Sequence, residues 1–361
     1  MGFAPIAGVL TSKTSSNTAL IASTAGLGAA TFVFAEATTF WQLLLARGAQ
    51  GAAPAAVMCG GLSLIAETHP QEIRGRAMGL AQTGLALGLL CGPLIGGLMF
   101  ERLGRVKTFR LAAGILLANA IAMVALMGVS PPEKTSDGNE KPAQKESLAI
   151  SSKRLLTNRD ILAVTFSTLA IHAVVGVIKP ISQVVLDTEF GISMVKRSFI
   201  ISIATVSYFV TAPLSGWLSD HMSRSHLVAS SLVIMSISSV FFALRNHLGI
   251  WSFYLCVSLL GVALGVQKSS SQTLLADLVD KHDLGEYSFA YALSDIADSM
   301  GLVLGPIVGL WLSQVYSYST GVLSMGMLCL LVAPVVMRIK YQSRKFELVK
   351  MLEFSSMLYI S

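Results

Sequence analysis

Long apolar runs separated by short polar stretches cover most of the 361-residue chain. A helix needs about 20 mostly apolar residues to cross the hydrocarbon of a bilayer, and ten runs reach or approach that length. None alternates as a barrel strand does, and Gly, Ala, Leu and Ile dominate them, so the pattern predicts helices. The predicted spans are 18–36, 41–66, 77–100, 108–130, 161–186, 197–218, 227–244, 249–275, 288–313 and 319–338.

The composition indicates the same class of protein. Only 13% of the residues are charged, against about 25% in a soluble domain, and the mean hydropathy is +0.67. These values exclude a water-soluble enzyme, a nucleic-acid binder and a disordered scaffold, and they leave an all-α protein embedded in a lipid bilayer. All four cysteines fall in apolar runs, which disfavours disulfides and metal sites. We expect no metal and no cofactor. The sequence lacks a Gly-x4-Gly-Lys-Ser/Thr run, so direct use of a nucleotide is not indicated.

Basic residues in the loops predict the orientation. Sixteen Lys and Arg fall on the side that holds the segment 131–159 and the C-terminal tail, and seven fall on the other side. The positive-inside rule therefore assigns that segment and the tail to the cytoplasm. The basic cluster between Arg102 and Arg110 argues against this orientation.

A polar segment divides the chain. Residues 131–159 contain six basic and four acidic side chains, which is typical of a flexible linker. We expect an N-terminal half at 1–130, a cytoplasmic linker at 131–159, a C-terminal half at 160–338 and a basic cytoplasmic tail at 339–361. Four full spans precede the linker and six follow it, as in a six-plus-six carrier that lacks its first helix and most of its second.

Small residues recur at helical spacing in both halves. Such faces let helix backbones approach closely, and from the residues alone they are explained equally well by packing. A repeated face is also what an internally duplicated carrier predicts. The first set comprises Gly88, Gly92, Pro93, Gly96 and Gly97, and the second comprises Gly301, Gly305, Pro306 and Gly309.

Several of these stretches resemble the major facilitator superfamily. Gly88–Gly97 looks like its helix-five antiporter motif, the run from Arg47 to Gly51 like its helix-four motif, and Gly216 to Asp220 with Arg224 like the loop motif between helices eight and nine. Leu278–Gly309 is similar to the vesicular amine transporter branch of the drug:proton antiporter group. The resemblance implies two pseudo-symmetric six-helix halves and a multi-pass location in a plasma, vesicle or vacuole membrane.

Acidic residues inside the predicted spans are the candidates for proton coupling, because a charge in lipid is costly unless it has a function or a partner. Asp295 matches an acidic position that the amine branch uses for proton or substrate handling, whereas Asp298 has no acidic counterpart there. Arg47 lies beside Gln50, and the resemblance implies a coupling or structural role near the cavity. Two alternatives stay open: Asp295 neutralises a nearby cation, and Arg47 extends to the interface.

Two lysines distinguish this chain from the amine branch. Lys268 stands where that branch has Asp in helix ten, and Lys179 stands where it has Glu before a proline. Cations in place of acids favour an anionic, zwitterionic or neutral substrate over a monoamine. Lys268 and Asp295 lie equally far from the loop that joins their antiparallel helices, so we predict an ion pair between them. Lys179 has the alternative of reaching the outer interface.

The remaining candidates are polar residues in predicted spans. Five of them are predicted to line a substrate cavity: His172, Gln183, Tyr208, Gln267 and Gln272. For His172 the alternative of a hydrogen-bonded packing residue stays open. Asp220 and Arg224 are predicted to latch helix ends. Together these features predict a monomeric secondary transporter that couples efflux of a small organic molecule to protons. A non-transporting descendant is the alternative. A membrane enzyme is less favoured, because no catalytic constellation is visible.

Overall fold

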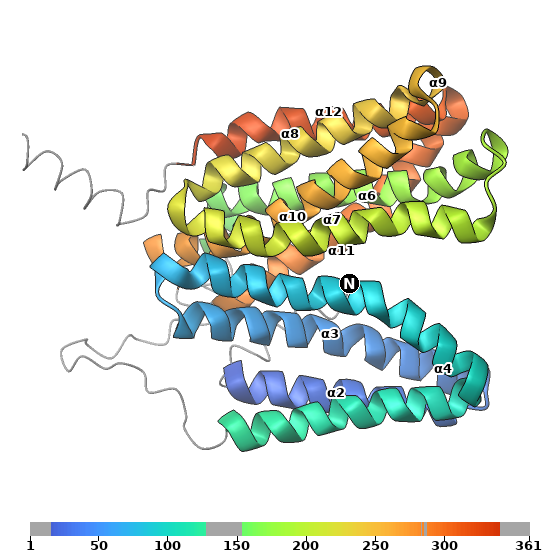
Figure 1. The fold of residues 1–361 in the computed structure, drawn as a ribbon. Coiled ribbons are helices and arrows are strands. Elements are labelled where there is room, and N and C mark those ends of the chain that lie inside the picture. The colour runs from blue at the N-terminus through green and yellow to red at the C-terminus, as the bar shows by residue number, and fades with distance from the viewer. Residues whose placement is uncertain (1–15, 128–153, 283, 285–286, 340–361) are drawn as a thin grey trace, which may run out of the picture. The chain divides into compact units, whose positions relative to one another are not determined.

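The computed structural model describes residues 16–127, 154–282, 284 and 287–339, and every regular element among them is a helix (Figure 1). The N-terminal stub, most of the linker and the tail lie outside the described residues. The labelled helices are α2 (Ser16–Glu36), α3 (Phe40–Thr68), α4 (Gln71–Met127), α6 (Arg159–Thr188), α7 (Met194–His221), α8 (Arg224–Ala243), α9 (Arg245–Leu248), α10 (Ile250–Lys281), α11 (Tyr287–Val315) and α12 (Tyr318–Met337).

Nine helices in the described part of the chain are long and apolar enough to cross a membrane. Two of the ten predicted spans, 77–100 and 108–130, lie on the single element α4, apart from three residues that are not described. An unbroken helix of 57 residues would measure about 86 Å at a rise of about 1.5 Å per residue, far more than a bilayer. The backbone of α4 breaks at Gly104, where φ is 72° and ψ is 173°. Glycine adopts this positive φ without a steric penalty, so one helical element contains two crossings.

Side-chain caps mark where two of the helices begin. Asn158 precedes α6, and its Oδ1 accepts hydrogen bonds from the backbone N–H groups of Asp160 (3.0 Å) and Ile161 (3.3 Å). Ser317 precedes α12, and its Oγ accepts from the N–H of Thr320 at 3.2 Å. These acceptors satisfy N–H groups that have no partner inside the helix.

The helices divide into two compact units, and each unit contains segments from both predicted halves of the sequence. Unit 1 contains α2, α3, α4 from residue 87 onward, the start of α6, the end of α10 from Leu278 and α11 up to Met300. Inside unit 1, α2 packs closely on α3, because the Leu20 backbone nitrogen is only 3.3 Å from the position of a Cβ on Gly60. The first turn of α11 also packs on α3, where the Ser63 and Ser288 hydroxyls form a buried hydrogen bond of 3.0 Å.

Unit 2 contains the first part of α4, most of α6, all of α7 to α9, α10 up to Asp277, the rest of α11 and α12. Here the second glycine face packs against α6. A Cβ on Gly301 would lie 2.5 Å from the Leu169 carbonyl oxygen, and one on Gly305 would lie 2.2 Å from that of Ala173. Such contacts with backbone atoms leave no room for a side chain. The absence of side chains is therefore what lets α6 and α11 approach each other.

The first glycine face has different surroundings. A Cβ on Gly88, Gly92, Gly96 or Gly97 would have no atom of the described residues within 4 Å. A packing partner for this face therefore stays a prediction. The halves 1–130 and 160–338 also stay a prediction, since the two compact units follow contacts and not sequence order.

Candidate functional site

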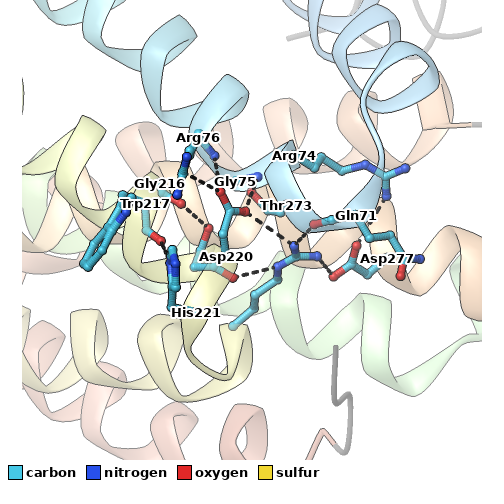
Figure 2. Close-up of polar contacts among 12 residues, drawn as sticks. Gln71, Arg74, Gly75, Arg76, Gly216, Trp217, Asp220, His221, Thr273 and Asp277 are labelled. Atoms are coloured by element: carbon cyan, nitrogen blue, oxygen red, sulfur yellow. Dashed lines mark hydrogen bonds and ion pairs between the residues drawn. The ribbon is translucent and has the colours of Figure 1, made fainter. Parts of the chain in front are cut away.

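Four charged side chains from four helix ends of unit 2 meet in one buried cluster (Figure 2). Asp220 lies in the last turn of α7, Arg224 begins α8, Asp277 lies in the last turn of α10, and Arg74 lies in the first turn of α4. Each is at most 9% exposed. We refer to Arg74, Asp220, Arg224 and Asp277 as the helix-end cluster.

Asp220 binds the beginning of α4 through its carboxylate. Oδ1 accepts from the backbone N–H of Gly75 at 2.8 Å, and Oδ2 accepts from that of Arg76 at 3.0 Å. Gly75 and Arg76 follow the first turn of α4, and the N-terminal end of a helix carries a partial positive charge, so a carboxylate there is favourable. The Arg76 Nε and Arg224 Nη2 atoms are each 3.7 Å from the same carboxylate.

Asp277 joins the two arginines of the cluster. Its Oδ1 is 3.3 Å from Arg74 Nη1, and its Oδ2 accepts from Arg224 Nη1. Arg224 also donates to the carbonyl oxygens of Ser219 (3.1 Å) and Gln71. Two guanidinium groups thus face two carboxylates, which balances the formal charge in a site with almost no exposure. Removing any one partner would leave a buried charge uncompensated.

Two glycines bring the helices close enough for these contacts. A Cβ on Gly216 of α7 would lie 2.5 Å from the Gly75 carbonyl oxygen and 2.8 Å from the Cα of Gly79. Only a residue without a side chain fits at this crossing. Gly216 and Gly79 therefore let α7 and α4 touch and allow Asp220 to reach the α4 backbone. Further along the same two helices, the Tyr208 hydroxyl donates to Gln82 Oε1 at 2.8 Å, and both residues are buried.

Besides Tyr208, three predicted cavity residues belong to the buried interior of unit 2. The Gln267 amide accepts from Ser231 Oγ at 2.6 Å and donates to Ser167 Oγ at 3.0 Å, so it links α10 to α8 and α6. His172 Nδ1 lies 2.8 Å from the Thr168 carbonyl oxygen of the preceding turn. Gln272 is also buried, one turn further along α10.

The other predicted substrate residues of unit 2 are more accessible. Lys268 follows Gln267 on α10 and is half-buried, while Lys179 on α6 is exposed and Gln183 is half-buried. The Gln183 carbonyl oxygen accepts from Arg197 Nη1 at 3.0 Å. Lys268 is therefore the predicted cation that lies nearest to the buried polar groups of α10.

Unit 1 contains the predicted coupling residues. Arg47 donates to Gln50 Oε1 at 3.3 Å, and its guanidinium carbon is 4.4 Å from the centre of the Phe34 ring. Gln50 Nε2 donates to Thr31 Oγ1 at 3.2 Å, so the pair contacts α2. Asp295 and Asp298 are half-buried on α11. Asp295 and Lys268 belong to different units, and their ion pair stays a prediction.

The sequence analysis did not single out Asp277, Arg74 or Gln82 as site residues. Of the three, Asp277 has the clearest feature in the sequence, because it is an acidic residue only two positions after the predicted span 249–275. Its partner Arg74 is 203 positions away in the sequence. A local sequence pattern cannot reveal a partner so far away in the chain.

A family model described as Major Facilitator Superfamily matches residues 1–180 and 164–350. The chain belongs to this superfamily. It is 25% identical over 347 residues to the synaptic vesicular amine transporter of Homo sapiens, an alignment that covers 95% of this chain and 65% of the relative. It is also 25% identical over 346 residues to the vesicular acetylcholine transporter of Homo sapiens, with 93% and 62% covered. The chain thus spans less than two thirds of the length of these relatives.

Solved structures have the same superfamily fold. The structure of FucP in the outward conformation has a TM-score of 0.72 at 16% identity and covers 94% of this chain and 87% of its own. The human organic anion transporter MFSD10 has a TM-score of 0.69 at 12% identity, with 92% and 80% covered. The chain is accordingly a multi-pass membrane protein with the all-helical fold of this superfamily.

Proposed function

We propose that this chain is a secondary transporter that moves a small organic molecule by alternating access, with no enzymatic step. The helix-end cluster carries the proposal. It connects the beginning of α4, which precedes the linker, to the ends of α7 and α10, which follow it. In the orientation predicted from the loop charges, all of these helix ends are cytoplasmic.

The cluster has the properties of a latch with two states. When assembled, the Asp220 carboxylate accepts from two backbone N–H groups, the Asp277 carboxylate pairs with two guanidinium groups, and the charges of the four cluster residues balance. A partly separated cluster would leave buried charges without partners, which costs several kcal/mol, whereas full separation hydrates all of them. Intermediate positions are therefore unfavourable, and helix ends joined in this way favour either contact or full opening.

Asp295 is our candidate for proton coupling, with Asp298 and Arg47 in supporting roles. Asp295 is a half-buried carboxyl within a membrane-spanning helix, and an ionisable group in that position needs a partner or a function. The resemblance of Gly88–Gly97 to an antiporter motif favours exchange of protons for substrate.

The substrate class follows from two cations. The relatives are called amine and acetylcholine transporters, whereas this chain has Lys268 and Lys179 at positions where the amine branch has acids. Lys268 is half-buried beside the Gln267 polar group on α10. A cation there repels a protonated amine and attracts a carboxylate, so we propose an anionic, zwitterionic or neutral substrate.

Flux into sealed vesicles tests the proposal. Purified protein is reconstituted, a proton gradient is imposed, and organic acids and amines are offered in parallel. We expect gradient-driven movement of acids or neutral compounds that Asp295→Asn abolishes and that Asp187→Asn retains. Asp187 is the matched control because it removes the same charge from an exposed position, where its side chain is 58% exposed.

Three results would contradict parts of the proposal. Preference for amines would overturn the substrate class and leave transport intact. Gradient-driven flux that survives Asp295→Asn would remove this residue from coupling. Absence of any flux from folded protein would favour the non-transporting alternative.

A further inference from the structure

A groove runs along one face of α4 after its break at Gly104. It has a volume of about 530 Å³ and lies entirely within unit 1. Its described lining residues are Leu103, Lys107, Arg110, Leu111, Gly114, Ile115 and Ala118. From Lys107 onward, a spacing of three and four residues places the lining residues on a single helical stripe. Space is open at Gly114, since no atom of the described residues lies within 4 Å of where its Cβ would stand.

The lining surface of the groove is almost entirely apolar, and the two lining residues that carry a charge lie at the end near the break. Lys107 and Arg110 supply two cations close to the break, and the remaining lining side chains are hydrocarbon. Arg110 forms a bidentate ion pair with Glu36 of α2, with N–O distances of 2.5 and 2.9 Å. Lys107 is exposed and has no ion pair with a described residue. One positive charge at this end is therefore available to a ligand.

The length of the stripe fits one leaflet of a bilayer. Lys107 and Ala118 are separated by a rise of about 16 Å along the helix, and half of the hydrocarbon core measures about 15 Å. The segment Ile95–Leu126 is a candidate span of which only 11% is buried inside the protein. The groove therefore opens toward the acyl chains of the leaflet in which Lys107 sits.

We propose that this groove binds an anionic phospholipid. The lipid phosphate pairs with Lys107, with Arg110 held beside it by Glu36, and one acyl chain lies along Leu111, Gly114 and Ile115. A neutral phospholipid has the same acyl chains but no net charge to pair with Lys107, so the charge at this end selects the headgroup. The site is separate from the helix-end cluster, which lies in unit 2.

Native mass spectrometry of detergent-purified protein tests the site. The protein is incubated with equal amounts of phosphatidylglycerol and phosphatidylcholine, and the lipid retained on the protein is counted. We expect preferential retention of phosphatidylglycerol. Lys107→Ala should weaken it by about fivefold, the factor that one surface cation contributes to binding an anionic headgroup. Lys107→Arg should retain it.

Three further variants distinguish binding in the groove from a general effect of surface charge or of added side-chain volume. Lys196→Ala removes an exposed cation of unit 2 and should leave the preference unchanged. Gly114→Leu keeps every charge but fills the groove, so it should reduce lipid retention. Gly26→Leu adds the same side chain at another position with no atom of the described residues within 4 Å of its Cβ, and it should leave lipid retention unchanged. Equal retention of the two lipids by the unmodified protein, or unchanged preference in Lys107→Ala, would overturn the proposal.

Discussion

The carboxylate of Asp220 accepts a hydrogen bond of 2.8 Å from the backbone N–H of Gly75. This contact joins the last turn of α7 to the beginning of α4 across 145 sequence positions. It depends on the close crossing at Gly216, and it ties a side chain of the C-terminal sequence half to the backbone of the N-terminal one. Because the acceptor is charged and its donors are backbone groups, substitution of Asp220 alone removes the contact.

Asp220→Ala should open the helix-end cluster. A hydrogen bond to a charged group contributes about 1.5–3 kcal/mol, and Asp220 accepts two from the α4 backbone. Alkylation of a cysteine introduced at the fully buried Thr273 measures the opening. We expect faster labelling in the Asp220→Ala background, and unchanged labelling in Asp187→Asn. Equal labelling in all three backgrounds would mean that Asp220 does not hold the cluster closed.

Asp277→Asn should destabilise the protein by about 3–5 kcal/mol, because Arg74 and Arg224 lose their buried counter-charge. The thermal midpoint of purified protein measures this. The triple variant Asp277→Leu, Arg74→Met and Arg224→Met removes all three charges and should recover much of the loss. A triple variant that is less stable than Asp277→Asn would contradict the charge argument.

Gly216→Ala should lower the thermal midpoint, since the added Cβ meets backbone atoms of Gly75 and Gly79 closer than 3 Å. Gly88→Ala is the matched control. Its Cβ has no described atom within 4 Å, and Ala is favoured over Gly within a helix by up to about 1 kcal/mol. We expect equal or greater stability for Gly88→Ala. A loss comparable to that of Gly216→Ala would indicate that a segment outside the described residues packs on the first glycine face.

Lys268→Asp should shift substrate preference toward amines, because it exchanges the half-buried cation of α10 for an anion. Competition between an organic acid and an organic amine in the vesicle assay measures the shift. Lys196→Asp makes the same charge change at an exposed position and should leave the preference unchanged. Identical preference in both variants would remove Lys268 from substrate selection.

Local patterns in the sequence were sufficient for the class of protein and for most helix positions. Apolar runs of about 20 residues can have few other structures in a bilayer, because every backbone polar group there must be bonded within its own segment. The prediction for Asp220 and Arg224 came from their resemblance to a superfamily loop motif. They lie four residues apart across a short loop, and their predicted role at helix ends needed no distant partner.

The partners of those residues were decided only by the tertiary structure. Asp277 meets Arg74 across 203 positions, and Tyr208 meets Gln82 across 126, so no window of the sequence contains either pair. The two glycine faces look alike in sequence, yet only the one on α11 has α6 against it among the described residues. Hydropathy and helical periodicity indicate which face of a helix is apolar or carries small residues. Which helix covers that face depends on how the whole chain packs, because close approach is a property of two surfaces and not of one.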